Sequence, residues 1–129
     1  MNEKEIDNII SKTVNETVSK LKLAGLIEND RKTAYQKTEE LLRNYNEFKL
    51  SEEPRTKKLV TMIDNALCKM QDDIYYDIIP MTYFDNETRE NIAEHFNTSQ
   101  RTISRNKGRL INQLKIKLFS DDVIFELFL

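Results

Sequence analysis

The sequence predicts an all-α fold, and three observations support that prediction. Only 2 glycines and 2 prolines interrupt the 129 residues, so the chain contains few residues that break helices. Apolar residues recur at spacings of three and four, which places them along one side of a helix. No segment shows the sustained alternation of apolar and polar residues, with a period of two, that a half-buried strand requires.

The first two thirds of the chain predict a series of helices separated by turn residues. Gly25 ends the first helix, and Asn29 offers a cap for the second. Pro54 fits only the first turn of a third helix, where its missing N–H is not needed. Pro80 should kink or shorten a fourth helix. The expected ranges are about 3–23, 31–48, 53–70, and 72 or 73 through 83.

Two further helices, joined by a tight turn, are expected near the end of the chain, at about 88–96 and 99–118. Residues 123–129, which are apolar except for Glu126, follow as a last half-turn or short helix, which should dock on the N-terminal helices or on a second protomer. The expected domains are an N-terminal helical domain, 1–82, for assembly or partner contact, and a C-terminal domain, 83–129.

The spacing of residues around the tight turn predicts a helix-turn-helix. Ala93 supplies a small residue where the second helix must cross close to the first. Asn97 tolerates the left-handed conformation that such a turn needs. Ile103 points back into the core, and Ser99 is a good N-cap for the second helix.

Positive charge is concentrated on this second helix, although the chain as a whole has a net charge of −2. Residues 99–119 contain six Lys or Arg and no Asp or Glu. Such a block on an acidic chain indicates a site for double-stranded DNA, with the helix in the major groove. The expected base contacts are Gln100, Arg101, Ser104 and Arg105. The expected phosphate contacts are Arg89, Ser99, Thr102, Lys107 and Arg109.

One glycine falls within this basic helix. Gly108 is expected on the outer face, together with Arg101, Arg105 and Asn112. There it either leaves clearance for a close phosphate or is a harmless surface residue, and the sequence favours neither interpretation.

Residues 83–118 resemble region four of bacterial sigma factors, the helix-turn-helix that reads the −35 promoter element. Two positions depart from that pattern, because Thr98 replaces the usual aliphatic residue and Asn106 replaces a buried Ile or Leu. The matching residues are Glu90, Ile92, Ala93, Glu94, Phe96, Ser99, Thr102, Ile103, Ser104, Arg105, Ile111 and Leu114.

The whole chain is similar to the ArpU-type late-gene regulators of phages and prophages. The similarity rests on the length, on the segment KTEELLRNYNEFK at 37–49 and on the C-terminal helix-turn-helix. It implies a sequence-specific regulator of late phage genes. Residues 1–82 are acidic on balance, and their aromatic residues fall on helical core stripes, which argues against a complete sigma factor.

Nothing in the sequence assembles an active site, so we expect no enzyme and no cofactor. Cys68 is the only cysteine and is expected to be a small buried thiol. His95 is the only histidine and should be exposed, with no second residue to complete a metal site. The chain lacks a signal-peptide pattern and lacks a run of roughly 18 apolar residues. We therefore expect a cytoplasmic protein that does not enter a membrane.

Three functions remain open from the sequence. The first is a DNA-binding transcriptional regulator, active as a monomer or a homo-oligomer. The second is the DNA-recognition subunit of a phage packaging or recombination machine, which predicts a ring-like oligomer. The third is a helical adaptor that binds RNA polymerase, for which the basic helix would be dispensable.

Overall fold

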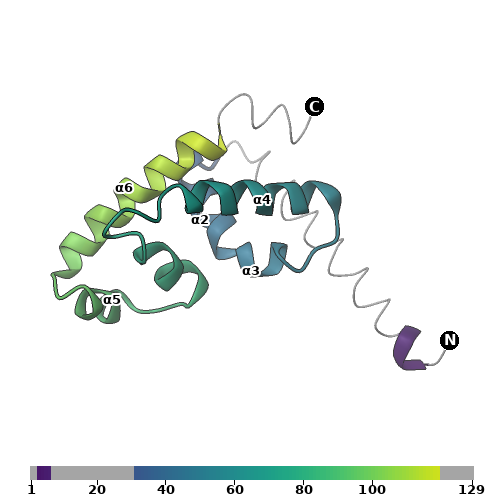
Figure 1. Ribbon diagram of the computed structural model, residues 1–129, viewed down its shortest axis with the longest axis horizontal. Helices are drawn as coiled ribbons and strands as arrows, with labels where there is room; N and C mark the ends of the chain where they lie inside the picture. The colour runs from purple at the N-terminus through teal and green to yellow at the C-terminus, as the bar shows by residue number, and fades with distance from the viewer. Residues whose placement is uncertain (1–2, 7–30, 120–129) are drawn as a thin grey trace.

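A computed structural model describes residues 3–6 and 31–119, and these residues form helices and turns without any strand (Figure 1). The all-α prediction is therefore confirmed. The predicted helix 3–23 lies mostly outside the described residues, although 3–6 are helical, and the apolar segment 123–129 lies outside them entirely. The described elements are α2 (Ala34–Arg43), α3 (Tyr45–Phe48), α4 (Pro54–Cys68), the π-helical turn η1 (Pro80–Phe84), α5 (Arg89–His95) and α6 (Gln100–Leu118).

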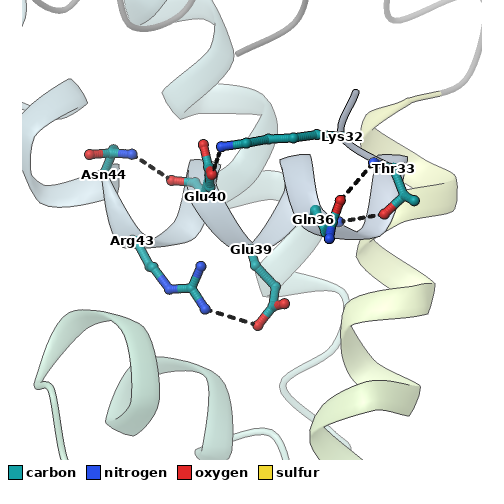
Figure 2. A network of polar contacts seen from close by, with 7 residues as sticks. All are labelled: Lys32, Thr33, Gln36, Glu39, Glu40, Arg43 and Asn44. Carbon is teal, nitrogen blue, oxygen red and sulfur yellow. Dashed lines mark hydrogen bonds and ion pairs between the residues drawn. The ribbon is translucent and has the colours of Figure 1, made fainter. Parts of the chain in front are cut away.

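The helix predicted over 31–48 is interrupted, because α2 and α3 are separated at Asn44. A capping box begins α2, in which the Gln36 N–H donates to Thr33 Oγ1 at 3.1 Å and the Thr33 N–H donates to Gln36 Oε1 at 3.0 Å (Figure 2). At the other end, the side-chain amide of Asn44 donates to the carbonyl of Glu40 at 2.9 Å. Asn side chains that bond to nearby backbone favour an end to regular helix, which accounts for the break.

The start of α4 agrees with the prediction, since Pro54 occupies its first turn. Glu53 precedes it and accepts a hydrogen bond from the Thr56 N–H at 2.8 Å. The prediction that Cys68 is buried is wrong, because this residue is exposed at the end of α4. At about 100° per residue it falls roughly 140° away from the buried Ile63, outside the apolar stripe.

The predicted start of the fourth helix at 72–73 is also wrong, because residues 71–77 form turns and helical backbone begins only at Ile78. Asp73 Oδ1 accepts from the Tyr75 N–H at 2.9 Å, a side-chain turn that competes with helix formation. Ile74, expected on an apolar face, is 81% exposed as a result. Regular winding resumes just before Pro80, which opens the π-helical turn, and the Asp85 N–H closes that turn on the Pro80 carbonyl at 2.9 Å.

The long helix α6 forms the centre of the packing, because it contacts α2, α4 and α5. In Figure 1 it is the yellow-green helix, with α5 beside its first turns. One cluster of buried side chains joins Leu41 of α2 and Ile63 of α4 to Ile92 of α5 and Leu110 of α6. The hydrophobic core is therefore continuous across residues 82 and 83, where the sequence analysis divides the chain. That domain boundary stays a prediction.

Candidate nucleic-acid interface

A tight turn between α5 and α6 sets the position of the basic helix. Asn97 has φ of 51°, the left-handed conformation expected of it. The Thr98 N–H donates to the Ala93 carbonyl at 3.0 Å, and Ala93 is only 6% exposed. Ser99 Oγ then accepts from the Thr102 N–H at 3.1 Å and caps α6. The local predictions for the turn and for the cap are confirmed.

The two sides of α6 differ sharply in burial. Its inner side consists of buried side chains, while Arg101, Arg105 and Asn112 are exposed on the opposite side. Neither Arg101 nor Arg105 makes a hydrogen bond or an ion pair within the described part of the chain. The buried residues are Ile103, Leu110, Ile111, Leu114 and Leu118.

Of the other two expected base contacts, Gln100 is exposed in the first turn of α6, and Ser104 is half-buried on its flank. Gly108 is half-buried as well and does not lie on the open outer face. A Cβ added at Gly108 would lie 3.8 Å from the hydroxyl oxygen of Tyr35 in α2, an ordinary van der Waals contact. The expectation for Gly108 is corrected, because α2 covers that edge of α6.

Arg109 has the most constrained side chain of the expected phosphate contacts. Its Nη1 and Nη2 donate to Asp73 Oδ2 and Oδ1 at 2.6 and 3.0 Å, and its Nε donates to Asn106 at 3.2 Å. The Arg109 hydrogen bonds, together with the Tyr75 N–H, lower the pKa of Asp73. The Asp73 carboxylate raises the pKa of Arg109 in turn. A two-bond pairing of this kind holds the guanidinium in one orientation.

The other expected phosphate contacts differ in availability. Arg89 is exposed at the start of α5 and has no hydrogen bond or ion pair among the described residues. Lys107 Nζ lies 3.9 Å from Glu39, beyond hydrogen-bond distance. The hydroxyls of Ser99 and Thr102 lie 3.0 Å apart and bond to each other at the start of α6.

Glu39 of α2 links three elements around the basic helix. Its carboxylate accepts from the Tyr83 hydroxyl of η1 at 2.7 Å and from Arg43 at 3.3 Å (Figure 2), and it faces Lys107 of α6. Burial, and then the hydrogen bond to Glu39, raise the pKa of Tyr83. The roles of Glu39 and Asp73 are not predictable from the sequence, because their partners lie 44 and 36 residues away and no local spacing indicates them.

A cleft of about 200 Å³ lies between η1, α5 and the flank of α6. Its polar lining comprises Thr82, Glu87, Arg89, Ser104 and Lys107, over two isoleucine side chains. The Thr82 hydroxyl is buried and has no hydrogen-bond partner in the described structure. The cleft thus combines two cations and an unsatisfied hydroxyl.

Another side of α5 carries acidic residues. A wider hollow of about 530 Å³ there is lined by Glu90 and Glu94, together with residues of the turn and Gln100 in the first turn of α6. Carboxylates repel phosphate, so the acidic side of this hollow disfavours a polyanion.

No protein-family model, curated protein or solved structure matches the chain. Within residues 3–6 and 31–119, no three His, Cys, Asp or Glu side chains are placed to hold a metal ion. The helices of these same ranges include none with the length and apolar character needed to span a bilayer.

Proposed function

We propose that the chain is a sequence-specific DNA-binding regulator of transcription that places α6 in the major groove. The observation that carries the proposal is the pair Arg101 and Arg105, which are exposed and have no partner among the described residues, on a helix whose other side is packed in the core. Guanidinium groups without a partner in the protein are available to a polyanion, and the packing holds them in a fixed direction.

The dimensions of α6 suit the groove. Its 19 residues span about 28 Å, and a B-DNA major groove about 12 Å wide admits one helix. Gln100, Arg101 and Arg105 lie in its first two turns, where recognition helices meet base edges. Arg pairs well with guanine and Gln with adenine, so these side chains would carry sequence preference.

The proposed phosphate contacts surround this base-reading set. Arg89 and Lys107 are the available cations, with Ser99 and Thr102 beside them at the start of α6. Arg109 would reach a phosphate only after giving up its two bonds to Asp73. The resemblance of residues 83–118 to sigma region four supports promoter DNA as the partner, and late phage or prophage genes as the regulated class. A cytoplasmic location belongs to the same proposal.

Selection of bound duplex from a random pool tests the proposal. We expect enrichment of one motif, and binding to that motif should weaken steeply with added salt because bound phosphates release counterions. A scrambled duplex should bind more weakly at every salt concentration. Failure to enrich any motif, with no salt-dependent binding, would contradict DNA recognition.

The two alternative functions left open by the sequence predict different experimental results. A polymerase adaptor should keep its function when Arg101 and Arg105 are both changed to Glu, whereas a DNA regulator should lose it. A packaging or recombination subunit should form a closed ring in solution, which sedimentation measures directly. The regulator is favoured because Arg101 and Arg105, on the exposed face of α6, have no partner among residues 3–6 and 31–119.

A further inference from the structure

We propose that the cleft between η1, α5 and α6 binds one phosphate of the DNA backbone. This inference rests on the proposed function and deepens it, because it gathers scattered contacts into one site. It places Ser104, predicted from the sequence to contact a base, in the phosphate site, together with Thr82, for which the sequence predicts no role.

The charge of the cleft favours an anion. Arg89 enters it from α5 and Lys107 from α6, so two cations from different elements line one cavity. Arg89 has no partner within the described residues, and Lys107 has only the 3.9 Å contact with Glu39. Glu87 is the one carboxylate of the lining, and it already accepts from the Asn91 side chain at 3.1 Å.

The hydroxyl groups of the cleft lack acceptors. Thr82 Oγ1 is buried without a partner, which is unusual in a folded protein and often marks a missing ligand or water. The Ser104 hydroxyl likewise has no hydrogen bond in the described structure. Threonine in helical backbone adopts two χ1 rotamers, so Thr82 has a second direction in which to offer its proton. Phosphate oxygens accept such bonds.

The location of the cleft points to DNA rather than to free phosphate. Ser104 lies on the flank of α6, between its buried side and the exposed Arg101, and Lys107 lines the same cleft from the inner side of the helix. When the exposed side faces base edges, this flank faces a wall of the groove, and phosphates line that wall. The volume of about 200 Å³ leaves room for a diester group with part of its sugar.

The test uses the full chain and the selected duplex, with each phosphate near the motif replaced in turn by a neutral methylphosphonate. One position should lower wild-type affinity about tenfold, as expected for a charge-assisted hydrogen bond. In Arg89→Gln and in Thr82→Val that replacement should have little further effect, because the partner is already lost. Arg55→Gln is the matched control, since Arg55 is an exposed cation on α4 that does not line the cleft.

Two further readouts separate the outcomes. Thr82→Val should not lower the melting temperature, because it removes a buried hydroxyl that has no partner. Millimolar inorganic phosphate should not shift the Thr82 and Ser104 amide resonances by as much as the duplex does. The inference would be overturned, and the proposed function left intact, if the duplex bound strongly but no single methylphosphonate replacement lost its effect in Arg89→Gln and Thr82→Val. Tight binding of inorganic phosphate, with no such dependence of the methylphosphonate effect on Arg89 and Thr82, would assign the cleft to a free anion and would also overturn the inference. Absence of duplex binding would instead contradict the proposed function.

Discussion

Arg105 and Arg109 lie one turn apart on α6, yet their surroundings differ. The sequence predicts that both contact DNA, because both belong to the same basic block. Arg105 is exposed and has no partner within 3–6 and 31–119, whereas Arg109 is held by Asp73. No local pattern predicts that pairing, since Asp73 lies 36 residues earlier in a segment expected to be helical. The position of an arginine on α6 is thus set by the local sequence, but whether its side chain is free to contact DNA depends on tertiary contacts.

Asp73→Asn should raise DNA affinity by releasing Arg109. The salt dependence of log K should steepen by about one unit if one phosphate contact is gained. The variant retains an oxygen that can accept from the Tyr75 N–H, so the turn should persist. Asp72→Asn, a neighbouring exposed residue, is the control. Equal salt slopes for both variants and the wild type would show that Arg109 takes no part in binding.

The same pair should affect stability at acid pH. Because Arg109 lowers the folded-state pKa of Asp73 below its ordinary value of 3.8, the pair stabilises the fold above that pH. The contribution is lost as pH falls through the lower, folded-state pKa. Urea unfolding between pH 5 and pH 2 should therefore show a steeper loss of stability in wild type than in Asp73→Asn, by about 0.5–1 kcal/mol for a partly exposed pair. Parallel profiles would contradict this assignment.

At the scale of elements, the α5–turn–α6 segment was predictable and the segment before it was not. Helix caps and left-handed turns depend on residues within a few positions of one another. Ser99 and Asn97 therefore predict the cap and the turn from the sequence. Residues 71–77 look helical by their apolar spacing, yet Asp73 turns the backbone and leaves Ile74 exposed. The spacing of apolar residues alone does not predict that a side chain such as Asp73 will bond to the backbone and prevent helix formation.

Asn97 offers a direct test of the turn. With φ of 51°, Asn97→Ala should lower the free energy of unfolding by about 1 kcal/mol, because a Cβ is disfavoured in the left-handed region. Asn97→Gly is the matched variant and should be neutral or slightly stabilising, since glycine adopts this conformation without strain. Chemical denaturation measures both. Equal losses for Ala and Gly would mean that the side chain of Asn97, rather than its backbone conformation, supports the turn.

At the scale of the molecule, the basic helix is supported by elements on both sides of the predicted domain boundary. The buried cluster includes Phe48 of α3 and Leu114 of α6, which belong to the predicted N-terminal and C-terminal parts respectively. Helical spacing predicts which apolar residues are buried, but it does not predict that the N-terminal and C-terminal parts share one core. The exposed face of α6 is therefore held in place partly by the N-terminal helices.

A shared core predicts one cooperative unfolding transition. Leu114→Ala should lower the free energy of unfolding by about 2–5 kcal/mol, the usual cost of deleting a fully buried leucine side chain. Phe48→Ala should act on the same transition by about 3–5 kcal/mol. Circular dichroism and tyrosine fluorescence should report coincident curves for both variants. Two separated transitions, each sensitive to one substitution, would instead support independent domains at 1–82 and 83–129.

The central claim is that the exposed face of α6 reads DNA bases, and the binding of Arg101→Ala and Arg105→Ala to the selected duplex tests it most directly. Arg55→Ala is the control, because its place in the first turn of α4 is remote from the first turns of α6 (Figure 1). Each α6 substitution should cost about 1–3 kcal/mol of binding free energy and relax base preference at one or two positions, while Arg55→Ala changes neither. If Arg101→Ala and Arg105→Ala both leave affinity and base preference unchanged, α6 does not enter the major groove.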